Sequence, residues 1–139
     1  MERTLVLIKP DAMKRALAGA ILGRLQSQGF KLAALKMLHM DKALAQKHYS
    51  VHKEKPFFKG LVDYITSSPI VAAVFTGENV VEEIRKAMGP TDPAKTAPGT
   101  IRGDFGLDIE RNAIHGSDSV ETAEREIKLF FSEKEIFNY

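Results

Sequence analysis

Apolar residues occur along this chain in short continuous runs, which favour buried strands, and in longer runs at helical spacing, which favour amphipathic helices. The first continuous run, Thr-Leu-Val-Leu-Ile over residues 4–8, ends at Lys9 and Pro10. We expect a strand buried on both faces, with Lys9 at its exit. Further strands are predicted over residues 31–40, 70–76 and 113–116. Residues 32–35 are also good helix formers, so a helix stays open as the alternative for that stretch.

Helical spacing appears in five segments between and after these strands. The first ends at Gly29, a residue type that tolerates the left-handed conformation at a helix C-terminus. Two short helices follow, one over about residues 42–51 and one that opens at Pro56. Asp118 or Ser119 can cap the last helix, which runs to about residue 131. The residues expected on the buried faces are Leu17, Ile21, Leu22, Leu25, Phe57, Leu61, Ile65, Val80, Val81, Ile84, Ala87, Met88, Val120, Ala123, Ile127, Phe130 and Phe131.

The stretch from residue 89 to about residue 112 has no periodicity and is rich in glycine and proline. Such composition predicts a long loop, and long loops in small domains usually carry function. The predicted order is therefore a βαβ unit, two helices, a βα unit and, after this loop, a short strand and a last helix.

Composition limits the classes of protein that the chain can represent. Its 139 residues are 44% apolar and 27% charged, which is the balance of one globular domain over residues 1–139. A net charge of +2 is far from the excess expected of a dedicated nucleic-acid surface. No stretch is apolar enough to span a membrane and no secretory pattern opens the chain, so we expect a cytoplasmic protein. With no cysteine, thiolate chemistry is excluded.

Familiar nucleotide and metal motifs are missing. The chain has neither a Gly-x-x-x-x-Gly-Lys-Ser/Thr loop nor a Gly-x-Gly-x-x-Gly turn after a strand. His48 and His52 could face one metal from a helix, but Tyr49 occupies the position where the zinc-protease pattern requires glutamate. Cationic and hydroxyl groups do lie at the ends of predicted elements, and together they could surround a polyphosphate, although each alone is an ordinary surface residue. These groups are Lys9, Arg85, Thr91 and Arg102.

His115 is the strongest candidate for chemistry because it lies in a short apolar strand between the loop and the last helix. A neutral imidazole is suited to nucleophilic attack near pH 7, but a buried core histidine is an equal alternative. A second group would have to orient the ring. Glu126 and Glu124 flank opposite edges of the buried face of the last helix, and spacing does not choose between them.

Residues 112–119, Asn-Ala-Ile-His-Gly-Ser-Asp-Ser, closely resemble the active-site signature of the nucleoside diphosphate kinase family. The resemblance extends over nearly the whole chain, through residues 4–11 with Lys-Pro-Asp, His48-Tyr49, Pro-Phe-Phe at 56–58 and residues 98–105. It implies a ferredoxin-like βαββαβ fold with a four-stranded antiparallel sheet covered by helices. It also implies a ping-pong reaction in which a nucleoside triphosphate phosphorylates His115 and a different nucleoside diphosphate then collects the phosphate. Mg²⁺ would accompany the nucleotide.

The resemblance also assigns roles by position. His115 would be the nucleophile, Glu126 with Ser117 would orient it, and Tyr49 and Lys9 would line the place of transfer. The phosphate contacts would be Arg85, Thr91, Arg102 and His52; the sugar contacts would be Lys9 and Asn112; the apolar contacts to the base would be Phe57, Leu61 and Ile109. Stacking without base-edge hydrogen bonds predicts little discrimination among nucleobases, because every base has a π-face.

Three positions depart from the usual family pattern, although none is a proposed catalytic group. They are Ala12, Lys55 and Glu110. The resemblance implies a homo-oligomer, a hexamer or tetramer built from dimers. Many relatives continue past Tyr139 with a segment that packs on a neighbouring subunit, whereas this chain stops there, so a dimer stays open as well. The alternative from another functional class is a ferredoxin-like binding module that holds a nucleotide or nucleic acid without catalysis.

Overall fold

The computed structural model describes residues 1–139, in which four strands form one antiparallel sheet in the order β2-β3-β1-β4. The strands are β1 (Glu2–Ile8), β2 (Lys31–Leu38), β3 (Ile70–Gly77) and β4 (Ile114–Gly116). Neighbouring strands all run antiparallel. The short strand β4 therefore lies at one edge of the sheet, beside β1. Lys9 directly follows the last residue of β1, next to the start of β4.

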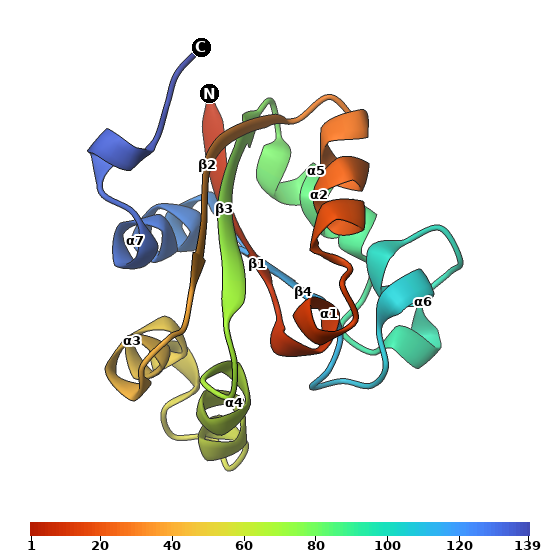
Figure 1. Cartoon of the computed structure of the whole chain (residues 1–139), viewed down its shortest axis with the longest axis vertical. Coiled ribbons are helices and arrows are strands. Elements are labelled where there is room, and N and C mark those ends of the chain that lie inside the picture. The colour runs from red at the N-terminus through yellow and green to blue at the C-terminus, as the bar shows by residue number, and fades with distance from the viewer.

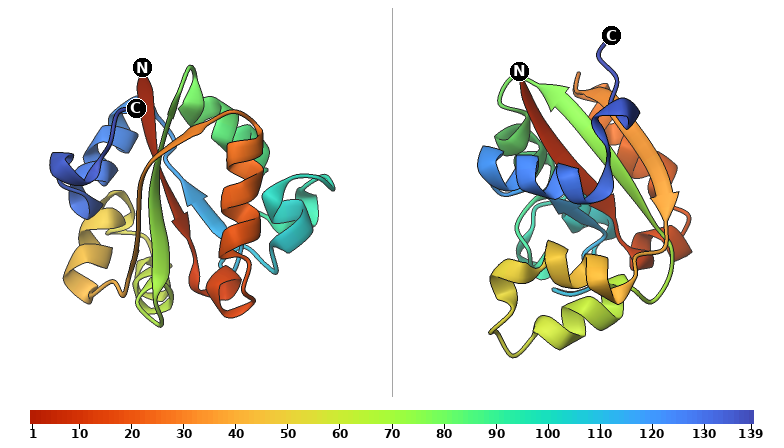
Figure 2. Two further views of the ribbon diagram at one scale, coloured as in Figure 1. Left: turned by 45° about the horizontal axis from the view of Figure 1, so that its top comes forward. Right: turned by 90° about the vertical axis from the view of Figure 1, so that its left-hand side faces the viewer.

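Helices cover both faces of the sheet (Figures 1 and 2). On one face lie α2 (Ala18–Ser27) and α5 (Val80–Met88); on the other lie α7 (Val120–Phe130) and the pair α3 (Lys42–His48) and α4 (Phe58–Ile65). Two five-residue helices, α1 (Pro10–Lys14) and α6 (Ile101–Phe105), lie near the end of the sheet where β1 finishes. Single-turn 3₁₀ helices span Ser50–His52, Pro93–Lys95 and Glu133–Glu135. The predicted ferredoxin-like βαββαβ arrangement is confirmed, with α3 and α4 inserted between β2 and β3.

The sequence of strand β1 is apolar without alternation because helices cover both faces of the sheet. Successive side chains on a strand point to opposite faces, and here both faces are covered. Leu5 and Leu7 pack under α7 and the α3–α4 pair, whereas Val6 and Ile8 pack under α2 and α5. Both pairs are completely buried. No helix of the structure combines the length and the apolar character that crossing a membrane requires.

Several predicted details are wrong at the ends of elements. Phe57 is not buried but 51% exposed, because it precedes α4, which begins at Phe58. The helix turns Val62 and Ile65 inward and leaves Leu61 half-buried. Val120 is 47% exposed, because it is the first residue of α7 and faces a surface groove beside Glu2.

The stretch 89–112 is also more ordered than a loop. It contains α6, which the Thr100 side chain caps by accepting a hydrogen bond from the Gly103 N–H, and whose first residue, Ile101, is buried. A helix of five residues is too short to show periodicity, and the same reason explains why α1 is not apparent in the sequence.

Candidate active site

The edge strand β4 holds His115 in a fixed register beside β1. Leu7 pairs with His115, and Ile8 pairs with Ile114. The strand also lies close to α5, because Gly116 has no side chain: a Cβ there would lie 2.5 Å from the sulfur of Met88. This close approach brings Arg85 of α5 to the end of β4, where its Nη1 donates to the Gly116 carbonyl oxygen at 3.0 Å.

A carboxylate and a hydroxyl lie behind the His115 ring. Nε2 of His115 is 3.0 Å from Oε1 of Glu126, and the Ser117 hydroxyl donates to the same oxygen at 2.7 Å. The Ser117 hydroxyl in turn accepts from the Leu5 N–H of β1 at 3.3 Å, so its direction is set by the sheet. The carboxylate is 95% buried, whereas the His115 side chain keeps 24% of its surface exposed.

The charge of Glu126 determines which ring nitrogen of His115 is free. Burial alone would raise the pKa of Glu126, but hydrogen bonds and charge from His115, with help from His48 and Ser117, lower it from 4.5 to about 2. An ionised carboxylate only accepts hydrogen bonds. Nε2 therefore carries the proton, and the lone pair of the neutral ring lies on Nδ1.

The structure resolves the choice between the two glutamates on α7. Glu124 forms a salt bridge with Arg3 at 2.5 Å, and that hydrogen bond lowers the pKa of its carboxyl group. Glu126 alone of the two points to His115. The sequence could not settle this, because both side chains flank the same helical face.

His48 is a site residue whose place sequence reasoning missed. At the end of α3 it is 2% exposed, its ring meets the His115 ring edge-on at a centroid distance of 4.7 Å, and its Nδ1 is 3.6 Å from Glu126 Oε2. Burial, with the nearby charge of His115, lowers the pKa of His48 to about 3, so the ring is neutral at pH 7. The sequence disfavours a metal shared by His48 and His52, and His52 packs near Phe57, at a ring distance of 5.5 Å. The match of His48-Tyr49 to the family pattern was the sequence signal that could have placed His48 in the site.

Lys9 and Asn112 form a buried pair next to β4, the strand that holds His115. Lys9 Nζ donates to the Asn112 side-chain oxygen at 2.9 Å and to the Glu110 carbonyl oxygen at 2.7 Å. The Asn112 amide nitrogen is held by the carbonyl oxygens of Thr91 and Ile109. Burial lowers the pKa of Lys9 to about 8, which the charge of Arg102 supports and that of Asp11 opposes.

Arg102 is a second buried cation in this region. It is 7% exposed, and its two terminal nitrogens donate to the carbonyl oxygens of Gly89 and Ile114, at 3.1 and 2.8 Å. Its Nε has no partner. Burial and the charge of Arg85 lower the pKa of Arg102 to about 10, so it remains charged at pH 7. Lys9, Arg85 and Arg102 form no salt bridge with a carboxylate. Arg85 is exposed, but Lys9 and Arg102 are buried, and an unpaired buried charge is costly unless a ligand supplies an anion.

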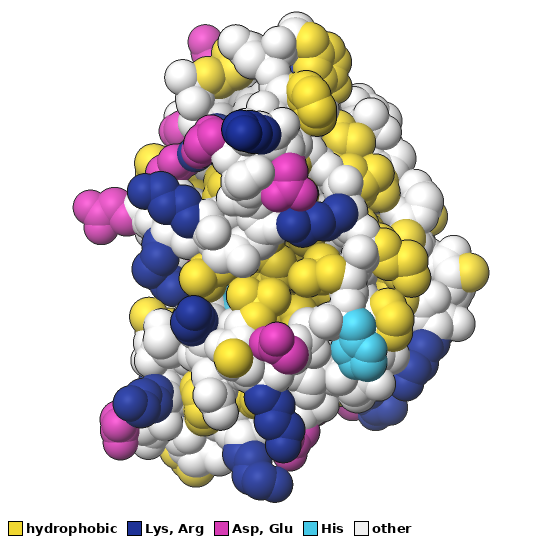
Figure 3. Space-filling view, turned by 60° about the vertical axis from the view of Figure 1, so that its left-hand side comes forward, with side chains coloured by type: hydrophobic (Ala, Val, Ile, Leu, Met, Phe, Trp, Pro, Cys, Tyr) yellow, Lys and Arg dark blue, Asp and Glu magenta, His cyan; other side chains and the backbone are white.

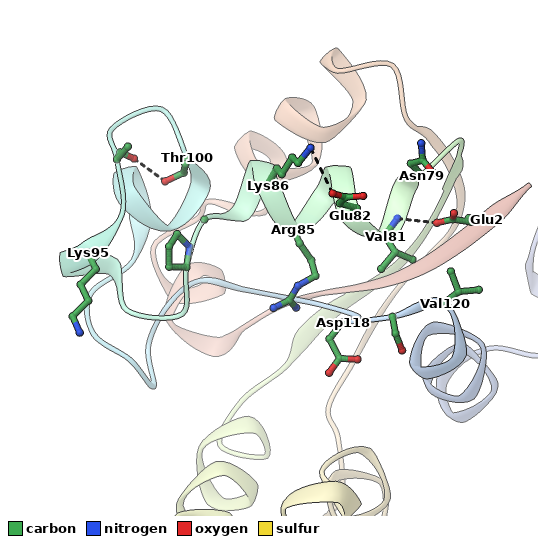
Figure 4. A pocket seen from close by; sticks show the side chains of 14 residues that line it. Glu2, Asn79, Val81, Glu82, Arg85, Lys86, Lys95, Thr100, Asp118 and Val120 are labelled. Carbon is green, nitrogen blue, oxygen red and sulfur yellow. Dashed lines mark hydrogen bonds and ion pairs between the residues drawn. The ribbon is translucent and has the colours of Figure 1, made fainter.

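A groove of about 870 Å³ lies beside α5. In Figure 4, Arg85 points from α5 toward the end of β4 and Asp118. Lys86, the next residue, points away and pairs with Glu82. Neither His115 nor Lys9 lines this groove, whereas Arg85 does and also donates to the carbonyl oxygen of Gly116, the residue after His115.

The remaining predicted residues lie around this centre with fewer contacts. Tyr49 follows α3 and its ring packs edge-on against His48, at 4.7 Å between centroids; burial raises the pKa of its phenol. Burial, with the charge of Lys55, lowers the pKa of His52. Thr91 and Ile109 are exposed. Of the three apolar residues expected at the nucleobase, Phe57 and Leu61 are adjacent at the start of α4, where the Leu61 N–H donates to the Phe57 carbonyl oxygen at 3.0 Å.

An imidazole with one ring nitrogen free, beside cations without carboxylate partners, is the arrangement that a phosphotransferase with a covalent intermediate needs. The family model described as Nucleoside diphosphate kinase matches residues 2–136. The chain belongs to this family of enzymes, which transfer the terminal phosphate between nucleotides.

Individual relatives agree over the full length. The chain is 63% identical over all its 139 residues to the nucleoside diphosphate kinase of Dehalococcoides mccartyi strain 195, covering 98% of that protein. It is 55% identical to the one from Archaeoglobus fulgidus, again over 139 residues and covering 92% of that protein.

Solved structures give the same result. The Aquifex aeolicus nucleoside diphosphate kinase superimposes with a TM-score of 0.96 at 47% identity, with 98% of this chain and 99% of that chain covered. The Halobacterium salinarum nucleoside diphosphate kinase, solved in complex with CDP, gives 0.96 at 46% identity, with 99% and 92% covered.

Proposed function

We propose that this chain carries the terminal phosphate of a nucleoside triphosphate to a nucleoside diphosphate on Nδ1 of His115. The observation that carries the proposal is the ring itself: Nε2 is bound to a buried carboxylate while three cations without carboxylate partners lie around the strand that holds it. A histidine buried only for packing would need neither feature.

The two half-reactions use the same atoms. Nδ1 attacks the terminal phosphorus, an N–P bond forms, and the bond from phosphorus to the bridging oxygen breaks, so that its electron pair leaves with the diphosphate. A terminal oxygen of the second nucleoside diphosphate then attacks the phosphohistidine, and the N–P electron pair returns to Nδ1. Both steps pass through the same arrangement of residues.

Glu126 acts on the ring rather than on the ligand. Its hydrogen bond keeps the Nε2–H tautomer and stabilises the positive charge of the phosphorylated imidazole, as the carboxylate of a catalytic triad stabilises an imidazolium. Ser117 holds the carboxylate in place by its hydrogen bond to Oε1. His48, neutral and packed against the ring, excludes water from the rear of the site.

The cations account for the rest of the catalysis. Phosphoryl transfer depends mainly on positioning and on neutralising charge on the phosphate oxygens. Lys9, Arg85 and Arg102 supply this charge, and the hydroxyls of Tyr49 and Thr91, with His52, complete the phosphate contacts by position in the family motif. Lys9 and Asn112 would also meet the sugar hydroxyls. Phe57, Leu61 and Ile109 would contact the base, with little discrimination among bases.

Mg²⁺ fits this site as a companion of the phosphates. The one group of three histidine and carboxylate side chains with converging ligand atoms is His48, His115 and Glu126, which lies behind the ring and offers mainly nitrogen. Mg²⁺ prefers oxygen ligands and keeps several waters. Near Arg85 the chain offers the exposed carboxylate of Asp118. An ion held chiefly by phosphate oxygens and water would neutralise their charge while the residues above fix their position.

Labelling tests the proposal directly. The protein is incubated with ATP that is labelled in its terminal phosphate and then freed of nucleotide. We expect about one acid-labile, alkali-stable label per chain, removed by addition of GDP as labelled GTP. A protein that binds ATP but takes up no label would be the binding module instead.

The structure's surface and the family resemblance suggest further expectations. On the face in Figure 3, Lys and Arg side chains lie among Asp, Glu and apolar ones, which supports small nucleotides rather than a polynucleotide as ligands. We expect residues 1–139 to act as one domain in a cytoplasmic homo-oligomer. Sedimentation equilibrium would distinguish a hexamer, a tetramer and a dimer.

A further inference from the structure

A single buried carboxylate, Asp11, connects three parts of the site that are distant in sequence. Asp11 belongs to α1 and is 6% exposed. Its Oδ1 accepts a hydrogen bond from the Tyr64 hydroxyl at 2.6 Å, and its Oδ2 accepts from the Ala113 N–H at 3.0 Å. The Asp11 N–H donates back to the Tyr64 hydroxyl at 2.8 Å.

Tyr64 lies on α4, the helix that carries Leu61 and follows Phe57. Figure 1 shows α4 and α1 at the same end of the sheet. Besides its two hydrogen bonds to Asp11, the Tyr64 ring lies 5.7 Å from Lys9 Nζ. Burial and the hydrogen bond to Asp11 raise the pKa of Tyr64, so the phenol stays protonated and keeps its role as donor.

Ala113 is the residue that leads into β4. It is completely buried and has φ of +75°, a backbone conformation that is costly for any residue with a Cβ. Its N–H is held by Asp11 and its carbonyl oxygen accepts from the Lys9 N–H at 2.9 Å. The strained link therefore depends on contacts from the end of β1 and from α1, and it sets the direction from Asn112 to His115.

We propose that Asp11 and Tyr64 are a positioning pair. The pair couples α4, the helix that carries the expected contacts to the nucleobase, to Lys9, Asn112 and the strand of His115. Neither side chain touches the reacting atoms. Tyr64 fixes α4 relative to α1, and Asp11 transmits the same position to Ala113. This inference rests on the proposed function, because it assumes that Phe57 and Leu61 meet the nucleobase.

The coupling has a consequence that a merely structural role would not have. If Tyr64 acts through α4, its hydroxyl matters only for phosphate donors that carry a nucleobase. Inorganic tripolyphosphate reaches the phosphate cations without touching α4. Loss of general stability would instead affect both donors equally.

The test compares His115 phosphorylation by ATP and by tripolyphosphate, both with Mg²⁺, in single-turnover kinetics. Tyr64→Phe keeps the ring and removes both hydrogen bonds to Asp11. We expect kcat/KM with ATP to fall about five- to tenfold, mainly through KM, and the value with tripolyphosphate to change less than about twofold. Tyr139→Phe is the matched control: it removes a phenolic hydroxyl that donates to Leu32 on β2, remote from the site, and both donors should be unaffected.

Asp11→Ala extends the test to β4. It removes the acceptor of Ala113 as well, so the reaction with tripolyphosphate should now also slow, by about tenfold. Equal losses with both donors in Tyr64→Phe, or no loss, would overturn the pair, and so would an Asp11→Ala enzyme that reacts normally with tripolyphosphate. If the wild-type protein is not phosphorylated by ATP at all, the proposed function fails rather than the pair.

Discussion

The two ends of the site are built differently. Beside His115, Glu126 and Ser117 are buried, and one oxygen of Glu126 accepts hydrogen bonds from both Ser117 and the imidazole. At the end expected to meet the base, Phe57 and Ile109 are 51% and 61% exposed. A reacting nitrogen must be held within a few tenths of an ångström, whereas a π-face contact tolerates many bases. Rigidity is thus concentrated where bonds form and break.

The largest effect should come from removing the reacting ring. His115→Ala is expected to abolish the phosphoenzyme and lower kcat by more than about 10⁴-fold, the order seen when a covalent nucleophile is deleted. The labelling experiment measures this, with ATP affinity as the control for a folded site. Normal labelling of the variant would mean that another residue is the nucleophile.

Acid should destabilise the protein through the buried carboxylate beside the imidazole. The pKa of Glu126 is lowered from 4.5 to about 2 in the folded protein. A depressed carboxyl pKa stabilises the fold above pH 4.5, and this contribution is lost as pH falls from 4.5 toward 2. The difference corresponds to about 3 kcal/mol. Urea unfolding at pH 7 and pH 3 should show about 2 kcal/mol of this loss in the wild type, because pH 3 lies about 1.5 units below 4.5. The loss should be smaller in Glu126→Gln, and equal losses would contradict the linkage.

The kinetic role of Glu126 is a separate prediction. Glu126→Gln keeps the shape but loses the charge, so the phosphorylated imidazole loses its stabilising partner. We expect kcat to fall about 10- to 100-fold with ATP binding nearly unchanged. Glu124→Gln, two residues away on α7, is the matched control because Glu124 pairs with Arg3, and its kcat should stay within about twofold. Weaker ATP binding with unchanged turnover in Glu126→Gln would refute the role.

The smallest effect belongs to the exposed end. Phe57→Ala should raise KM about tenfold for ATP, GTP and CTP alike, because stacking is worth about 1–3 kcal/mol and does not read base edges. Phe137→Ala, another exposed aromatic residue, should have no effect. A change in KM for one base only would show that this end is selective, and the contrast between the two ends would then be weaker.

Apolar runs and helical spacing were enough to predict β1, β3, β4, the main helices and the unusual position of His115, because they report which faces must be buried. They left β2 open to a helix. The resemblance added the family, and with it the topology. The sequence pattern missed α1 and α6, because five residues show no helical period, and it wrongly predicted a buried Phe57.

The way side chains from separate elements meet became visible in the folded molecule alone. The fold turned Glu126 rather than Glu124 toward the ring, brought His48 from α3 against it, and joined Asp11 to Tyr64 and Ala113. Such contacts join residues far apart in the chain, and their geometry follows from sheet register and helix packing. Local patterns carry no information about either.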